Sequence, residues 1–295
     1  MSKYKVLSFY KYVLIENPEE IAKEHLSWCL DNTVRGKIYL AKEGINGSVF
    51  GDDEIINKYK EHLTGYKIFE DVWFKETSTE QIAYSKMHVR VKDEIVNSNL
   101  NNTNLENSAP KLSPEQLIDF YESKKEFVIV DARNWYESKI GKFKNAITPQ
   151  VKHFREWPKV VESLNQYKDK TIVTYCTGGI RCEKASAYMR EQGFKDVYQM
   201  DGGILNFIQK YPDTYWEGGM FVFDERKVVE PNKKEELKYT ANCYFCNKPT
   251  AYHINCHNVI CDKLIVCCHD CKVEKEYCCS NECRTSERKR KVTSG

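Results

Sequence analysis

A cysteine between a strand-like run and a helical pattern is the residue best placed for chemistry in this sequence. The loop Tyr175-Cys176-Thr177-Gly178-Gly179-Ile180-Arg181 follows the apolar run 171–174 and precedes a helical pattern over 182–192. At such a junction the loop N–H groups, the positive end of the helix and the Arg181 guanidinium can converge on the Cys176 sulfur. They favour the thiolate, which is the nucleophilic form.

We therefore expect Cys176 to act as a nucleophile or persulfide carrier, with Arg181 and the loop N–H groups stabilising negative charge. A buried structural cysteine is the alternative, but it would require neither two loop glycines nor an arginine five residues on. The residues expected to contact substrate in this loop are Thr177, Gly178, Gly179 and Ile180.

Two further residues near the loop are candidates for catalysis. Cys182 follows Cys176 by six residues, in the first turn of the expected helix. It could resolve a persulfide on Cys176 as a disulfide, or it could be a small residue that packs the helix. Asp131 ends the apolar run 127–131, and we expect it to hold the active loop by accepting hydrogen bonds from loop N–H groups.

The C-terminal part of the chain carries a second set of reactive residues. Ten of the thirteen cysteines lie between residues 243 and 283. Pairs of thiolates at this spacing suit tetrahedral Zn²⁺, and a site closed by four cysteines is structural because no position is left for water. We expect two structural zinc ions, held by the pairs Cys243 and Cys246, Cys256 and Cys261, Cys268 and Cys271, and Cys279 and Cys283.

Spacing leaves several features of this cysteine-rich region open. The pairs could combine in sequence order or cross over, and iron–sulfur ligation by one set of four is an alternative to zinc. A metal-free cluster is less compatible with a segment of about 45 residues that is so poor in aliphatic side chains. The remaining candidates for ligands are Cys267, Cys278, His253, His257 and His269.

The first 95 residues show the β-α-β-β-α-β order of a ferredoxin-like (acylphosphatase-like) α+β domain. The expected strands and helices cover residues 4–13, 18–30, 37–41, 45–50, 53–63 and 66–74, followed by a further strand at 86–91. Lys42-Glu43-Gly44 is an expected hairpin turn. Lys42 and Asn46 could contact a phosphate or a base there, although a solvated loop would explain Lys42 equally well.

Residues 96–112 are rich in asparagine, a composition that does not order strongly, so we expect a linker. Ser113 and Pro114 open a second unit, residues 113–213, as helix N-cap and first helical residue. Alternating helix and strand patterns then predict a parallel sheet covered on both faces. Asp131 and Cys176 fall at carboxyl ends of its strands, where such sheets bind ligands.

A connecting segment (214–240), the zinc domain (241–285) and a basic tail (286–295) would complete the chain. Its 295 residues, 41% hydrophobic and with a formal net charge of +2, suffice for two or three domains with cores. We find no run of about 18 apolar residues and no features of a signal peptide, and we expect a cytoplasmic protein. The basic run 288–291 favours nucleic acid only weakly.

The segments that contain the candidate catalytic residues resemble segments of the rhodanese superfamily. The segment 176–181 has the Cys-x4-Arg form of its catalytic loop. Related phosphatases carry a loop one residue longer, so the shorter loop favours sulfur chemistry. The segment 127–137 is similar to the superfamily's entry motif, in which Arg133 and Glu137 are expected to form a structural ion pair. In the segment 141–147, a lysine and an asparagine replace the superfamily's histidine and glycine.

A narrower resemblance covers most of the chain. The segments 41–47, 176–185, 202–205 and 216–226 look like those of the rhodanese-related tRNA uridine hydroxylases. That resemblance implies 5-hydroxylation of the wobble uridine, position 34 of tRNA, with molecular oxygen as co-substrate. A wobble base already lies in a loop, so little unpairing is needed to present it to Cys176. The first unit and the zinc unit would clamp the anticodon arm.

Two other classes of function remain open. A sulfurtransferase needs only the Cys-x4-Arg loop and would carry sulfur as a persulfide on Cys176. A binding module without catalysis would use the rhodanese-like and zinc units to hold a partner. The sequence has no glycine fingerprint for a flavin and no evident pair of histidines with a carboxylate for iron. The redox cofactor, the electron donor and any protein partners therefore stay open.

Overall fold

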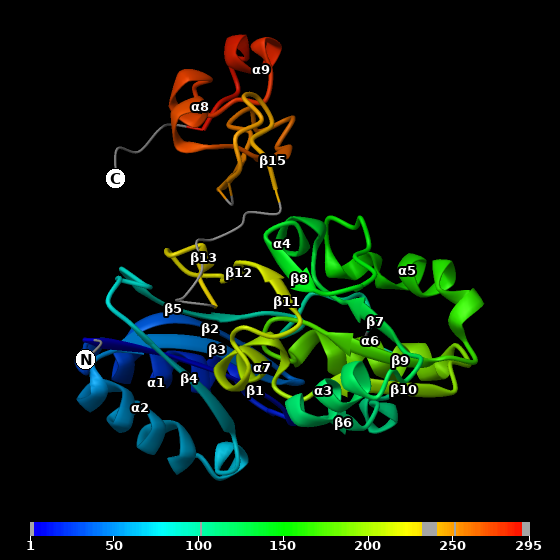
Figure 1. Cartoon of the computed structure of the whole chain (residues 1–295). Coiled ribbons are helices and arrows are strands. Elements are labelled where there is room, and N and C mark those ends of the chain that lie inside the picture. Colours follow the sequence, from blue (N-terminus) through cyan, green and yellow to red (C-terminus); the bar gives the residue numbers. More distant parts are fainter. Residues whose placement is uncertain (1–2, 101, 232–240, 251, 291–295) are drawn as a thin grey trace.

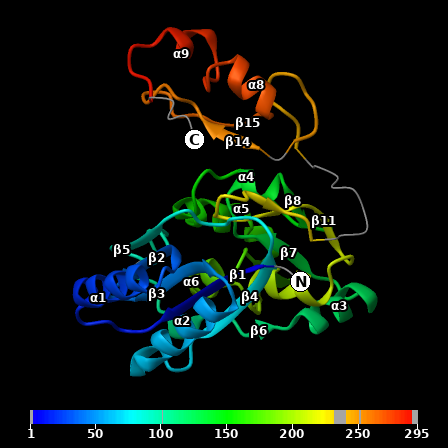
Figure 2. The same ribbon diagram turned by 90° about the vertical axis from the view of Figure 1, so that its left-hand side faces the viewer.

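The computed structural model describes residues 3–100, 102–231, 241–250 and 252–290. Two units pack against each other, and the cysteine-rich unit lies above them in both views (Figure 1, Figure 2). In the part of the chain that is described, no helix combines the length and apolar character needed to cross a membrane.

The N-terminal unit is a five-stranded sheet in the order β4-β1-β3-β2-β5. The predicted ferredoxin-like order is confirmed, with β5 added as an edge strand parallel to β2. Side chains of both helices join one hydrophobic cluster with one face of the sheet, which leaves the other face free for a different partner. The elements are β1 (Tyr4–Tyr12), α1 (Pro18–Asp31), β2 (Arg35–Ala41), β3 (Gly44–Gly51), α2 (Asp53–Gly65), β4 (Trp73–Thr79) and β5 (Met87–Val91).

The strand predicted at residues 66–74 is wrong in its position. A 3-10 turn, η1 (Lys67–Phe69), occupies its first half, and β4 begins only at Trp73. The Phe69 N–H donates to the Tyr66 carbonyl at 2.7 Å, and the Phe69 ring is fully buried. Aromatic residues are enriched in strands, but here a turn buries the Phe69 ring instead.

The second unit is a four-stranded parallel sheet, in the order β6-β10-β9-β7. Neighbouring residues on β7, β9 and β10, such as Ile172 and Val173, enter two different hydrophobic clusters, so helices cover both faces as predicted. Its elements are β6 (Lys111–Leu112), α3 (Pro114–Glu122), β7 (Val128–Asp131), α4 (Trp135–Ser138), β8 (Gly141–Phe143), η3 (Phe154–Glu156), α5 (Trp157–Ser163), η4 (Asn165–Tyr167), β9 (Thr171–Tyr175), α6 (Ile180–Glu191), β10 (Asp196–Met200) and α7 (Gly203–Lys210).

The asparagine-rich segment before β6 is not the weakly ordered linker that its composition predicts. In its described residues it contains η2 (Leu105–Asn107) and packs along α6. Arg190 donates to the Asn107 carbonyl at 2.8 Å, and the buried Ala109 N–H donates to Ser186 Oγ at 3.0 Å. Hydrogen bonds to α6, together with the burial of Leu100 and Ala109 in the core of the second unit, therefore order this segment.

Charged and polar side chains of α6 join the two units. Lys184, which is almost fully buried, forms ion pairs with Glu43 at 2.8 Å and Glu94 at 3.1 Å. The Tyr10 hydroxyl donates to Glu183 at 3.0 Å. The free face of the N-terminal sheet is thereby held against the loop that precedes α6.

The C-terminal part consists of short elements. One strand, β11, extends the second unit by pairing with β8. In its described residues, the cysteine-rich unit contains one hairpin and two short helices. The elements are β11 (Trp216–Gly218), β12 (Met220–Phe221), β13 (Val228–Val229), β14 (His253–Asn255), β15 (Leu264–Val266), α8 (His269–Glu274) and α9 (Asn281–Thr285).

Candidate functional site

Cys176 lies in the turn between β9 and α6. Strands β7 and β9 are parallel neighbours with Asp131 opposite Tyr175, so their carboxyl ends meet at one edge of the sheet. Cys176 Sγ accepts a hydrogen bond from the Gly179 N–H at 3.1 Å. Gly179 has φ of +99°, which residues with a Cβ rarely adopt, so glycine allows the loop to turn this N–H inward. The predicted approach of a loop N–H group to the sulfur is confirmed for Gly179.

The surroundings of Cys176 favour its thiolate. Burial opposes ionisation, but the hydrogen bond from Cys182, the charge of Arg181 and the N–H groups of Arg181 and Gly179 outweigh burial and lower the pKa of Cys176 to about 6. Burial and the hydrogen bond to Cys176 raise the pKa of Cys182 well above its usual value. Cys182 therefore stays protonated and donates to an ionised Cys176 at neutral pH.

Arg181 is held by a buried carboxylate. Its Nη1 and Nη2 donate to Glu137 Oε1 and Oε2 at 2.6 and 2.8 Å, a bidentate pair that fixes the guanidinium plane. Arg133 instead pairs with Asp131, at 2.6 Å between Nη2 and Oδ2. The expected ion pair between Arg133 and Glu137 is therefore wrong. Asp131 is only two residues from Arg133 and forms the ion pair with its guanidinium. Glu137 is therefore available to pair with Arg181 in the loop.

Asp131 does not hold the active loop through its N–H groups as expected. Its carboxylate accepts from the Arg133 N–H at 2.9 Å, from Ser138 Oγ at 2.9 Å and from Tyr175 Oη at 2.7 Å. With the Arg133 guanidinium these bonds occupy both carboxylate oxygens. Asp131 thus ties β7 to the end of β9, one residue before Cys176, and acts on the loop only through that strand.

The start of α7 supports the loop from the other side. The Cys176 and Thr177 carbonyls accept from the N–H groups of Ile204 and Leu205, each at 3.0 Å. A Cβ on Gly203 would lie only 2.4 Å from the Cys176 carbonyl oxygen, and Gly203 has φ of +64°. Only glycine permits this close approach of two backbones, so Gly203 sets the position of Cys176.

A cavity of about 710 Å³ opens above Cys176, between its loop and the free face of the N-terminal sheet. This volume is in the range of ligand pockets. Cys176, Thr177, Gly178, Ile180 and Arg181 line one side. Strand residues that alternate along the free sheet face line the other side, and they are Ser8, Tyr10, Lys37, Tyr39, Asn46, Ser48, Lys75 and Thr77.

The two candidates in the N-terminal hairpin are placed differently. Asn46 lines the cavity, and its Nδ2 donates to the Ile95 carbonyl at 2.9 Å. Lys42 is exposed at the hairpin turn and is not among the residues that line the cavity. Lys42 therefore fits a solvated turn, the alternative that the sequence left open.

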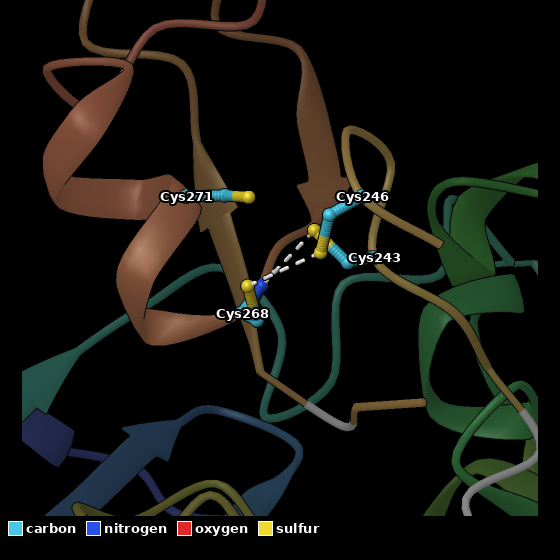
Figure 3. A group of neighbouring side chains, drawn as sticks. All are labelled: Cys243, Cys246, Cys268 and Cys271. Atoms are coloured by element: carbon cyan, nitrogen blue, oxygen red, sulfur yellow. Dashed lines mark hydrogen bonds between the residues drawn. The ribbon is translucent and has the colours of Figure 1, made fainter. Parts of the chain in front are cut away.

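The cysteine pairs of the C-terminal unit cross over. The first pair joins the third, Cys243 and Cys246 with Cys268 and Cys271 (Figure 3), and the second joins the fourth, Cys256 and Cys261 with Cys279 and Cys283. Within each group the sulfur atoms all lie within 4.8 Å of one another. Backbone N–H groups of Cys268 and Cys279 donate to Cys243 and Cys256 sulfurs at 3.4 Å, as is usual for thiolates that bind metal.

The other candidate ligands lie outside these two groups. The Cys267 and Cys278 thiols donate to the carbonyls of Cys268 and Cys283. His257 stacks on the Tyr277 ring at 4.6 Å between centroids. His253 packs against the rings of Tyr136 and Phe221 and so links the cysteine-rich unit to the second unit. His269 is absent from both groups as well.

Three family models match consecutive parts of the chain. Residues 4–95 match the UPF0176 acylphosphatase like domain, 113–210 the Rhodanese-like domain and 217–284 the Rhodanase C-terminal model. The tRNA uridine(34) hydroxylase of Acholeplasma laidlawii is 42% identical over 89% of this chain and 84% of that protein. The proteins of the same name from Bacillus licheniformis and Enterococcus faecalis are 40% and 42% identical over 90% of this chain.

The chain belongs to the tRNA uridine(34) hydroxylase family. The resemblance drawn from the four sequence segments is thereby confirmed. A solved rhodanese-like domain from Anabaena sp. is 21% identical, covers 37% of this chain and 79% of its own, and aligns with a TM-score of 0.32.

Several residues around the cavity of this hydroxylase family member were missed by sequence reasoning. They come from β1, from β4, from the segment after β5 and from the segment after β12, and they are Tyr10, Lys75, Glu94, Phe223 and Arg226. β1 and β4 show no strict alternation, because Val6 lies on the cavity-facing side of β1 and all side chains of the segment 75–79 in β4 are polar. The sequence therefore carried no clear signal for this face, and only the packing of the second unit shows that it is a cavity wall.

Proposed function

We propose that this chain hydroxylates C5 of the wobble uridine, position 34 of tRNA, in the cavity above Cys176. Family membership over about nine tenths of the chain carries the proposal. The lowered pKa of Cys176 supports it, because an ionised thiol in the wall of a cavity of this size is a reactive group next to a space that a base could occupy, although the Cys176 side chain itself is fully buried. In this proposal Cys176 is the catalytic residue, and Thr177, Gly178 and Ile180 contact the base.

The anticodon loop is the proposed ligand of the free sheet face. Cations and aromatic rings, which bind phosphates and stack bases, both occur there. Lys37 and Lys92 line the cavity together with Tyr39 and Tyr84. Phe223, whose side chain is about half exposed, lies near the Arg181 guanidinium at the cavity and offers a further ring for stacking. A base already unstacked in a loop would enter at little cost.

The reaction also requires electrons. Replacing the hydrogen on C5 by a hydroxyl group with molecular oxygen consumes two electrons and two protons and releases one water. Oxidation of two thiols to a disulfide releases two electrons and two protons. Cys176 and Cys182 are in hydrogen-bond contact, and we propose that their disulfide closes once per turnover and is then reduced again by an external thiol.

We propose two structural zinc ions for the cysteine-rich unit, in the crossed arrangement. Four thiolates for each ion leave no open position, so the metals would stabilise the fold and take no part in the reaction. The functional units would be residues 1–95, 113–213 and 241–285, with the substrate held between the first two. A cytoplasmic location follows from the proposed tRNA substrate.

Isotope labelling tests the oxygen chemistry. Cells that contain this protein as their only tRNA uridine hydroxylase would be grown briefly under ¹⁸O₂, and their tRNA would be digested to nucleosides for mass spectrometry. We expect 5-hydroxyuridine-derived nucleosides to gain one ¹⁸O atom. Growth in H₂¹⁸O under ordinary oxygen is the control, and label appearing only in that arm would contradict an oxygen-dependent hydroxylation.

Sulfur transfer is the second candidate function, favoured by the ionised Cys176 beside Cys182. Such an enzyme would carry a persulfide on Cys176, and Cys182 would release the sulfur by forming a disulfide. Because it makes no hydroxylated nucleoside, its loss would leave 5-hydroxyuridine-derived nucleosides unchanged.

A further inference from the structure

Lys75 extends from β4 of the N-terminal sheet into the cavity that Cys176 lines. It is only 4% exposed, which is rare for a lysine. Its Nζ lies 4.5 Å from the centroid of the Trp73 ring and 4.8 Å from that of Tyr10. Tyr10 and Trp73 face each other across β1 and β4, so the two rings hold the ammonium group between them.

Both rings also touch the backbone around Cys176. A Cβ on Gly179 would lie 3.1 Å from the Tyr10 hydroxyl oxygen. A Cβ on Gly202 would lie 2.3 Å from the Trp73 ring. Tyr10 therefore packs against the active loop, and Trp73 packs against the turn before α7 that supports this loop. Through these two rings the N-terminal domain places the Lys75 ammonium group beside the loop.

Lys75 lacks the close carboxylate partner that the arginines beside the cavity have, although Glu183 and Asp201 act on it from a distance. The Arg181 guanidinium is neutralised by Glu137, and that of Arg226 by Asp224 at 2.6 Å. Lys75 has no ion pair with any carboxylate among the described residues. A thiolate shielded from water is costly without a nearby positive charge, and an ammonium group in the same surroundings is costly without a negative one.

We propose that Lys75 is a positioning residue whose ammonium group balances the Cys176 thiolate, so that the N-terminal domain completes the reactive site of the rhodanese-like domain. The inference deepens the proposed function, but its test measures the thiol and not the hydroxylation. If hydroxylation were absent, the electrostatic pairing of Lys75 and Cys176 would still be testable.

The Lys75 ammonium group and the Cys176 thiolate each stabilise the charged form of the other. Burial lowers the pKa of Lys75 to about 8, while the Cys176 thiolate opposes this. Removing the ammonium group withdraws a positive charge from the thiolate and should raise the pKa of Cys176. The other titratable groups that act on the two are Tyr10, Tyr12, Lys111, Glu183, Asp201, Arg181 and Cys182, and all of them stay unchanged in the test.

Alkylation of Cys176 as a function of pH provides the measurement. The full chain would be pulsed with iodoacetamide between pH 4 and 10, quenched and digested with trypsin. Cleavage after Lys170 and Arg181 places Cys176 in the peptide 171–181, separate from Cys182, which begins the next peptide. Mass spectrometry of that peptide reports the midpoint of Cys176 ionisation despite the chain's other cysteines.

The expected result is a midpoint about one pH unit higher in Lys75→Met and Lys75→Gln than in the wild type. Lys75→Arg, which keeps the charge, should restore most of the wild-type value. Lys23→Met removes an equal charge from the exposed surface of α1 and should have no effect. Equal midpoints in Lys75→Met, Lys75→Gln and the wild type would overturn the proposal, as would an arginine variant that behaves like the neutral ones.

Discussion

The Cys268→Ser variant is expected to bind one metal ion per chain, whereas the wild type and Cys267→Ser bind two. These cysteines are neighbours in the sequence, but only Cys268 belongs to a group of four, together with Cys243, Cys246 and Cys271. Losing one of four thiolates lowers metal affinity severely, and the folding free energy of a small metal domain is largely its metal-binding free energy.

Elemental analysis of the purified full-length variants gives the metal content, and hydrogen exchange shows which unit loses its structure. We expect fast exchange confined to residues 241–290 in Cys268→Ser, with the second unit still protected. Two ions retained in Cys268→Ser, or one lost in Cys267→Ser, would contradict the crossed arrangement. The identity of the bound element distinguishes zinc from iron.

Replacing Glu137 with glutamine should destabilise the second unit by about 3–5 kcal/mol, the usual cost of leaving a buried charge without its partner. Glu137 is fully buried and Arg181 nearly so. The neutral amide cannot compensate the guanidinium, and the hydrogen bond from Asn134 N–H, at 3.1 Å, would be weakened too. Urea unfolding followed by hydrogen exchange of the peptides in 171–191 measures this loss.

Glu126→Gln is the matched control for Glu137→Gln. Glu126 forms an equally short ion pair with Lys170, at 2.7 Å, but the Glu126 side chain is 84% exposed. Water already solvates both of these charges, so we expect no appreciable change in the urea midpoint. Similar midpoints for the two variants would show that the pair of Glu137 and Arg181 does not brace the active loop.

The parts of the site that depend on adjacent residues were predictable. The loop 176–181 contains its own glycines, cysteine and arginine. Each cysteine pair lies within a short segment, so its spacing alone predicts metal binding. The ferredoxin-like order was readable too, because most of its strands and helices have their own hydrophobic period, although the strand that became β4 was placed too early in the chain. In all of these the local sequence and the fold require the same residues.

What was missed or left open depends on which distant residues pair with one another. Glu137 and Arg133 are spaced like a helical ion pair, yet Asp131 competes successfully for Arg133. The crossed cysteine pairs follow from how hairpin β14–β15 and the two short helices pack, which spacing does not encode. Lys75 was not singled out, because its neighbour across the cavity, Cys176, is about one hundred residues away in the chain.

The central claim is that Cys176 is the reactive residue of a wobble-uridine hydroxylase. It is tested most directly by nucleoside mass spectrometry of tRNA from cells that lack the protein and receive either the wild type or Cys176→Ser. We predict that 5-hydroxyuridine-derived nucleosides are lost and that only the wild type restores them. Restoration by Cys176→Ser would contradict the role of the thiol, and nucleosides unchanged by the deletion, in cells without a second hydroxylation pathway, would contradict the function itself.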